Sequence, residues 1–229
     1  MTEENIENIA KKIVENNKGI LAADESTNTI KKRFDSINVE SNEKTRCNYR
    51  YTLFSTPEIS KYISGVILFE ETFSQKNSNG ELLRNKLESV DCYPGIKIDQ
   101  GLEEINKDSI ETYTKGIETL DDRLKPFAKN GAKFTKWRAV INIGDSIPSP
   151  NCIEKNSSLL AEYALISQNN NLVPIVEPEV IMDGNHDIDK CYEVTKETLN
   201  QVFIHLKKKN VNLKGILLKP NMIVPGSKR

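Results

Sequence analysis

The sequence predicts an α/β fold in which parallel strands form a barrel, and three features lead to this prediction. Short apolar runs of β-prone residues start roughly every 30–45 residues, which is the spacing of strand–loop–helix units. Helical patterns fill several of the intervals between these runs. Charged residues stand at or near the carboxyl ends of most runs, the edge at which barrels carry their active sites.

Six runs are expected to form strands. They are GILAAD (19–24), ISGVILFE (63–70), YPGIKID (93–99), FTKWRAVI (134–141), LVPIVEPEV (172–180) and KGILLKPNM (214–222). Three intervals or flanks carry helical patterns. The first is TEENIENIAKKIVEN (2–16), with an apolar stripe, and the second is SSLLAEYALISQNN (157–170), which opens with cap-type serines. The third, at 188–210, ends in basic residues that suit a helix carboxyl terminus.

Alternation of strands and helices indicates a parallel sheet covered by helices, which leaves two architectures: an open doubly wound sheet and a (β/α)8 barrel. No GxGxxG motif or P-loop follows any run, which weakens the open, dinucleotide-binding version. Charge placement favours the barrel, because charge that points into a barrel is costly unless it is paired. The charged residues concerned are Asp24, Glu70, Glu71, Lys97, Asp99, Lys136, Arg138, Glu177, Glu179 and Lys219.

Composition fits one soluble globular domain spanning 1–229, with 37% hydrophobic and 28% charged residues. The formal net charge of -1 gives no reason to expect binding to nucleic acid or a membrane, so an anionic ligand would need a local cluster of cations. The acidic start lacks the pattern of a signal peptide, and no apolar run approaches the ~20 residues of a membrane span.

Metal binding is not expected. The chain has two histidines, and its four cysteines form no CxxC pair, so reduced cytoplasmic thiols are the natural interpretation. The acidic residues Asp183, Asp187 and Asp189 lack calcium-loop spacing and are expected to lie in a solvated loop.

Lys219 is the strongest candidate nucleophile. It follows Ile216, Leu217 and Leu218, so its stem is expected to be buried. Burial and neighbouring cations, Lys136 above all, would lower its pKa and favour the neutral amine that attacks carbonyl carbon. A structural lysine paired with a carboxylate is the alternative, and the pattern alone leaves it open.

Two further pairs are spaced two residues apart, so each pair shares one face of its strand. Glu177 and Glu179 suit proton transfer or ion pairing, and Lys136 and Arg138 suit phosphate binding or ion pairing. Asp24 could cap a following helix or aim its carboxylate at a bound hydroxyl. The residues by themselves leave each of these choices open.

Seven segments in order resemble the class I fructose-bisphosphate aldolases over essentially the whole chain from Ile9. They are GILAADEST, GVILFEETF, GIKIDQG, FTKWRAVI, VPIVEPEV, DGNHDI and LLKPNMIVPG. The resemblance implies a metal-free, cytoplasmic (β/α)8 barrel without a cofactor, usually a homotetramer. It also implies reversible cleavage of fructose 1,6-bisphosphate into dihydroxyacetone phosphate and glyceraldehyde 3-phosphate.

The resemblance also implies roles for individual residues. Lys219 would form the Schiff base, and Glu177 would serve as the acid/base for carbinolamine formation and dehydration. Asp24 would face the hydroxyl that loses its proton, with Lys136 assisting and Glu179 supporting. The substrate and phosphate region would be lined by Lys97, Arg138, Arg33, Arg46 and Ser26.

The family has eight β/α units, whereas this chain ends shortly after the sixth run, so about six units are expected. The barrel is therefore expected to be incomplete at its C-terminus, with unpaired edges that invite association. A phosphate-binding serine, glycine-rich turn and arginine, and a tail tyrosine, have no counterpart here. Two functions follow as alternatives: an aldolase, or a non-catalytic aldolase-like protein that binds sugar phosphates or partner chains.

Overall fold

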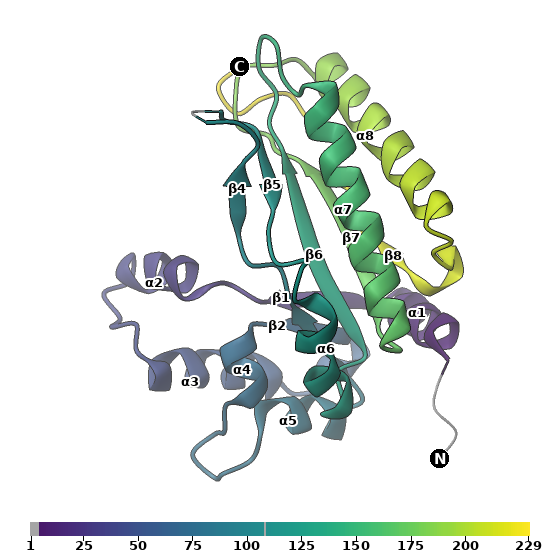
Figure 1. Ribbon diagram of the computed structural model, residues 1–229. Coiled ribbons are helices and arrows are strands. Elements are labelled where there is room, and N and C mark those ends of the chain that lie inside the picture. The colour runs from purple at the N-terminus through teal and green to yellow at the C-terminus, as the bar shows by residue number, and fades with distance from the viewer. Residues whose placement is uncertain (1–4, 108) are drawn as a thin grey trace.

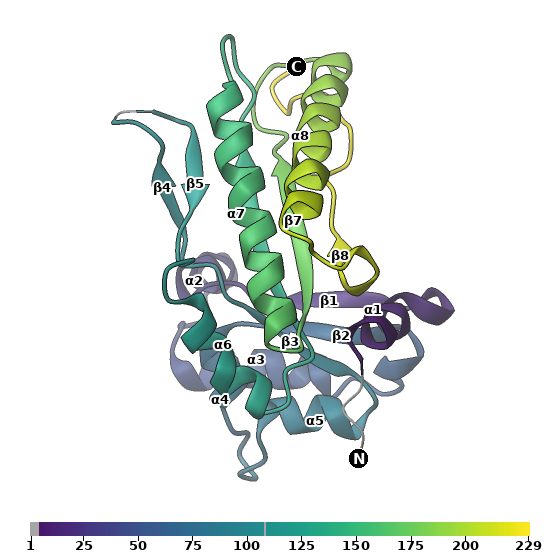
Figure 2. The same cartoon turned by 45° about the vertical axis from the view of Figure 1, so that its right-hand side comes forward.

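The structure is a computed structural model that describes residues 5–107 and 109–229. Six parallel strands form one sheet in the order β1-β2-β3-β6-β7-β8. They are β1 (Gly19–Ala23), β2 (Ile63–Leu68), β3 (Tyr93–Lys97), β6 (Phe134–Ile141), β7 (Val173–Val180) and β8 (Leu217–Leu218). Each predicted run contains one of these strands. The sheet curls so that β6 and β7 stand steeply to β1, β2 and β3, which gives part of a (β/α)8 barrel (Figures 1 and 2).

Helices cover the convex side of the curled sheet. The long helices α7 (Pro150–Asn169) and α8 (Ile188–Lys208) lie side by side over β6 and β7 in both views (Figures 1 and 2). The other helices are α2 (Thr27–Asp35), α3 (Glu43–Phe54), α4 (Glu70–Ser74), α5 (Leu83–Ser89) and α6 (Leu120–Lys129). Short 3-10 turns are η1 (Glu15–Asn17), η2 (Ile59–Lys61) and η3 (Leu213–Gly215).

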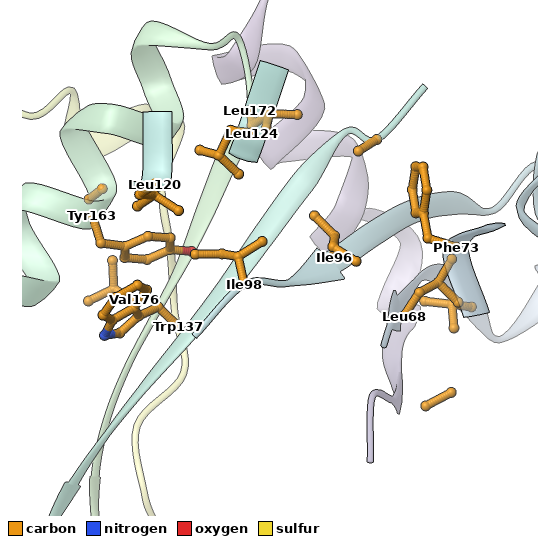
Figure 3. Close-up of a cluster of buried hydrophobic side chains, with 14 of the residues drawn as sticks. Leu68, Phe73, Ile96, Ile98, Leu120, Leu124, Trp137, Tyr163, Leu172 and Val176 are labelled. Atoms are coloured by element: carbon orange, nitrogen blue, oxygen red, sulfur yellow. The ribbon is translucent and has the colours of Figure 1, made fainter. Parts of the chain in front are cut away.

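The main core fills the space between the sheet and these helices. Trp137 of β6 stacks on Tyr163 of α7, with ring centroids 5.5 Å apart (Figure 3). The hydroxyl of Tyr163 donates to the Ile175 carbonyl at 3.1 Å and lies 2.8 Å from Thr135 Oγ1, so a buried polar group is satisfied. These contacts hold β6 and β7 against α7.

A second core lies inside the curl. Ile67, Phe134, Val173 and Ile175 point inward and pack against α1 (Ile6–Val14), which closes the amino-terminal end of the barrel through its apolar stripe. The strand glycines Gly65 and Gly95 make room for the Phe134 ring, because a Cβ added at Gly95 would lie 2.1 Å from it. The bottom of the barrel is therefore largely apolar, and the ion pairs of the inner face lie in the layers above it.

Several details of the prediction are wrong. Asp187 and Asp189 were expected in a loop, but they are the N-cap and a first-turn residue of α8. Helix α7 begins at Pro150 with Ser149 as its N-cap, whereas the cap-type serine Ser157 is buried inside the helix. Strand β8 covers only two residues of the run 214–222, because η3 takes up its start. An antiparallel hairpin, β4 (Leu102–Glu104) and β5 (Thr112–Thr114), was not expected, and Thr114 Oγ1 joins it to β6 by donating to the Arg138 carbonyl at 2.6 Å.

Candidate active site

Several of the charged residues that the sequence singled out gather at the carboxyl ends of the strands on the inner face of the curl, whereas Glu70 and Glu71 lie on α4. Along β6, Phe134 packs in the inner core and Trp137 in the outer core, so Lys136 and Arg138 share the inner face with Phe134. On β7, Glu177 and Glu179 likewise follow the inward residues Val173 and Ile175. The strand register sets Arg138 opposite Glu177, and Lys97 of β3 opposite Lys136. The alternation of side chains along each strand and the register between strands therefore bring these charged residues together.

Lys136 is the centre of the cluster. Its Nζ lies 3.0 Å from Asp24 Oδ2 and 3.1 Å from Glu177 Oε2, and all three side chains are buried. Burial alone would lower the pKa of Lys136, but the two carboxylates outweigh burial and hold its pKa above the ordinary lysine value. Lys136 is therefore a stable cation that links Asp24 at the end of β1 to Glu177 on β7.

Lys219 stands next to this centre, directly after β8. Its Nζ contacts Glu177 Oε1, and its backbone N–H donates to the Val176 carbonyl at 2.9 Å. Glu177 thus bridges the two lysine amines. The expectation of a buried stem is wrong, because the Lys219 side chain is 49% exposed. The reason is that β8 is an edge strand with β7 as its neighbour in the sheet.

Asn221 holds the segment that follows Lys219 in place. Asn221 Nδ2 donates to Thr195 Oγ1 of α8 at 3.1 Å, and its Oδ1 accepts from the Val180 N–H at 3.3 Å. One amide side chain therefore ties the segment that follows Lys219 to both β7 and α8. The sequence reasoning did not single out Asn221, although it lies two residues from Lys219.

Arg138 and Glu179 form the upper layer of the site. Arg138 Nε contacts Glu179 Oε2, and the two side chains are 43% and 33% exposed. Both residues, with Glu177 and Lys219, line a cleft of about 430 Å³ at the mouth of the curl. The site therefore has a buried layer of charge around Lys136 and a more exposed layer around Arg138.

On the β3 side, Lys97 Nζ lies 3.7 Å from Asp99 Oδ1. Burial raises the pKa of Asp99, although the positive charges of Lys97 and Lys136 oppose that rise. Asp99 was seen in the sequence only as a charge near a strand end. The structure places it within the electrostatic reach of Lys136, so it belongs to the surroundings of the cluster.

The remaining candidates lie beyond the end of β1, where Asp24 is followed by Glu25 and α2. Ser26 is the N-cap of α2, because its Oγ accepts from the Thr29 N–H at 3.3 Å. Capping of α2 is therefore not the role of Asp24, which binds Lys136 instead. Arg33 contacts Glu25 and is 58% exposed, whereas Arg46 is buried and held by both carboxylate oxygens of Glu71.

Among the described residues, no group of three or more His, Cys, Asp and Glu side chains is arranged to hold a metal ion. All four cysteines are buried free thiols. A search of the same residues finds no helix with the length and apolarity needed to cross a membrane. What the site offers chemically is two lysine amines and two carboxylates in contact, of which Lys219 and Glu177 line an open cleft and Lys136 and Asp24 are buried beside them.

Comparison with known proteins gives one consistent result. The family described as "Fructose-bisphosphate aldolase class-I" matches residues 5–229. A Xanthomonas axonopodis pv. citri protein, "Probable fructose-bisphosphate aldolase class 1", is 48% identical over 226 residues, which are 99% of this chain and 68% of that protein. "Fructose-bisphosphate aldolase 4, cytosolic" of Arabidopsis thaliana is 51% identical over 210 residues, covering 92% of this chain and 53% of that one.

A solved structure agrees with the sequence comparisons. It is described as the ternary co-crystal structure of fructose-bisphosphate aldolase from Plasmodium falciparum in complex with TRAP and a small molecule inhibitor. The TM-score is 0.95 at 47% identity, covering 97% of this chain and 65% of that one. The chain thus spans between about half and two thirds of the length of these relatives.

Proposed function

The chain belongs to the class I fructose-bisphosphate aldolase family, and from this membership we propose that it cleaves fructose 1,6-bisphosphate reversibly through a Schiff base on Lys219. The products would be dihydroxyacetone phosphate and glyceraldehyde 3-phosphate. The observation that carries the proposal is the contact of one buried carboxylate, Glu177, with two lysine amines of unequal exposure. A non-catalytic protein need not retain this set of charged residues.

Exposure assigns the two amines different tasks. Lys219 is half exposed and faces the cleft, so its Nζ can reach a ketone carbon, whereas Lys136 is buried between two carboxylates. Glu177 touches the Lys219 amine and is placed to take its proton, which leaves the neutral nucleophile. After attack, the same carboxyl group can return the proton to the carbinolamine hydroxyl, which leaves as water and produces an iminium ion.

Carbon–carbon cleavage would use the other end of the cluster. The iminium ion draws the electron pair of the breaking bond and becomes a neutral enamine, while the hydroxyl on the departing carbon loses its proton and becomes a carbonyl. Asp24 is the carboxylate that we assign to this proton, with Lys136 at 3.0 Å from Asp24 Oδ2 stabilising the developing charge. Glu179 would support the site through its ion pair with Arg138.

The substrate phosphates would bind to the cations around the cleft. Arg138 lines the cleft and is partly exposed, and Lys97 lies beside Lys136 in the strand register. Arg33 is largely exposed, so a phosphate could replace its Glu25 partner. Arg46 and Ser26 are engaged by Glu71 and α2, so we assign them to the border of the phosphate region.

Family membership also supports a cytoplasmic location and a homo-oligomer, usually a tetramer in this family, without nucleic acid or membrane partners. These assignments rest on the resemblance and on the name "cytosolic" that one relative carries. Sedimentation velocity of the purified chain would measure the oligomeric state.

The proposal is tested by the rate at which the full chain cleaves fructose 1,6-bisphosphate, with and without a chelator. We expect cleavage that the chelator does not affect and that Lys219→Arg abolishes, because a guanidinium cannot form the imine. Lys214→Arg is the matched control, since Lys214 is exposed on η3 outside the cleft. Chelator-sensitive cleavage, or full activity in Lys219→Arg, would contradict the mechanism.

A further inference from the structure

One buried cation next to the site is not explained by the proposed mechanism. Arg50 of α3 is fully buried, with 0% of its surface exposed. Arginine is rarely buried to this extent unless it is paired. It lies four residues beyond Arg46 on the same helix, directly behind the segment that carries Asp24.

The guanidinium of Arg50 clamps that segment. Its Nη2 donates to the Glu25 carbonyl oxygen at 2.7 Å, and Glu25 is the residue after Asp24. Strand β1 ends at Ala23, so Asp24 is the first residue beyond the ladder bonds of the sheet. The Arg50 bond is therefore a main-chain anchor immediately after Asp24, at the point where the ladder no longer holds the chain.

Arg50 also organises the charges around this anchor. Its Nη1 lies 3.6 Å from Glu71 Oε2, and its Nη2 lies 3.9 Å from Glu25 Oε2. Glu71 in turn binds Arg46, and Glu25 binds Arg33. Five charges of alternating sign thus connect α2, the Asp24 segment, α3 and α4.

Burial of Arg50 and its partners costs desolvation free energy. Burial lowers the pKa of Arg50, and the charges of Glu25 and Glu71 only oppose that effect. A buried ion network is weak grounds for assuming a gain in stability, because desolvation offsets the attraction between the charges. A role in fixing geometry accounts better for an arginine at this position, because its Nη2 holds a main-chain oxygen while Nε and Nη1 have no hydrogen-bond partner that would favour burial.

We propose that Arg50 is a positioning residue that holds Asp24 in place for the carbon–carbon cleavage step. Arg50 does not touch the cleft; it acts through the Glu25 main chain. The inference rests on the proposed function. It predicts that the two chemical stages respond differently to the loss of Arg50, because Arg50 contacts the segment after Asp24, whereas the Lys219–Glu177 contact joins β7 to the residue after β8.

The test is Arg50→Lys, which keeps the charge but loses the guanidinium. Three quantities are measured on the full chain: cleavage of fructose 1,6-bisphosphate, borohydride trapping of dihydroxyacetone phosphate on Lys219, and hydrogen exchange of the peptide 20–27. We expect trapping to stay within twofold of wild type and kcat for cleavage to fall about tenfold or more. Exchange in 20–27 should be faster, while exchange in β7 stays unchanged.

The matched control is Arg84→Lys. Like Arg50, Arg84 donates to a main-chain carbonyl, that of Phe73 at 2.7 Å. Each guanidinium also lies over an aromatic ring, Phe69 for Arg50 and Phe73 for Arg84, but no contact of Arg84 with Glu25 is found. It should leave trapping, cleavage and exchange in 20–27 unchanged. Cleavage at the wild-type rate in Arg50→Lys, or an equal loss of trapping and cleavage, would overturn the inference and leave the proposed function standing.

Failure of the proposed function gives a different pattern. In that case the wild-type chain would neither trap the ketone nor cleave the sugar. Hydrogen exchange would then still decide whether Arg50 holds the Asp24 segment, because it needs no substrate. Unchanged exchange in 20–27 would contradict the anchoring role in either case.

Discussion

At the scale of single residues, Lys136 decides the electrostatics of the site. It lies between Asp24 and Glu177 in a layer that solvent hardly reaches. Removal of one partner from a buried ion pair leaves the others uncompensated, which typically costs about 3–5 kcal/mol. Lys136→Met should therefore lower the free energy of unfolding at pH 7 by about 3 kcal/mol, measured by urea denaturation.

The pH dependence of this loss has a definite sign. The folded-state pKa of Lys136 is raised above its unfolded value, so its contribution is complete below the unfolded lysine pKa of about 10.4 and is lost as pH rises through the folded value. Wild type should therefore lose stability above about pH 10.4 more steeply than Lys136→Met. The exposed Lys129→Met serves as control. Equal alkaline slopes in the Lys136 variant and wild type would contradict the assignment.

Individual residues also show which features of the site the sequence predicts and which it does not. Spacing two apart predicted shared faces for Lys136 with Arg138 and for Glu177 with Glu179, and the ion pairs among them were foreseen as an alternative. Exposure of Lys219 was not foreseen, because the apolar run before it says nothing about whether the strand lies at an edge. Arg50 was missed because burial of a charged helical residue depends on partners far along the chain.

At the scale of elements, the inner face of each strand is divided into an apolar bottom and a charged top. The Phe134 ring fills the bottom layer against Gly65 and Gly95. Glycine at these two strand positions is thus a packing requirement. Lys136 lies two residues beyond Phe134 on the same face of β6. Displacement of the Phe134 ring would therefore also shift the charged side chains around Lys136.

Gly95→Ala should destabilise the protein by roughly 1–3 kcal/mol, because the new Cβ would overlap a ring that is fully buried. Urea denaturation measures the change. Gly19→Ala in β1 is the matched control, since its Cβ would meet its nearest atom at 3.9 Å and should cost little. Phe134→Leu combined with Gly95→Ala should recover part of the loss. A neutral Gly95→Ala would show that the ring does not need this space.

Elements differ in how well the sequence predicts them. The six strands are predicted by dense runs of apolar residues, and α1 and α8 by long stripes of apolar residues at helical spacing. Burial of one or both faces of an element produces these regular apolar patterns. Strands β4 and β5 have three residues each, and β4 is exposed, so burial leaves no such pattern there. The predicted start of α7 was wrong. Its N-cap, Ser149, is followed by Pro150 at the first helical position, and this Ser-Pro pair is the signal for the true start.

At the scale of the whole molecule, the curled sheet brings residues from both ends of the chain together. Asp24 follows the first strand and Lys219 the last, and they are linked through Lys136 of β6 and Glu177 of β7. Strands β1 and β8 are the two edges of this sheet, and an apolar pocket of about 330 Å³ lies between them. The family fold was predictable because the segments that form this inner face are distinctive in sequence.

The central claim is that Lys219 is an activated amine in this chain. The most direct test is borohydride reduction in the presence of dihydroxyacetone phosphate, followed by intact mass and peptide mapping. The account predicts one adduct per chain, on Lys219, and none in Lys219→Arg. Folded protein that gives no adduct, or an adduct on another lysine, would contradict the claim.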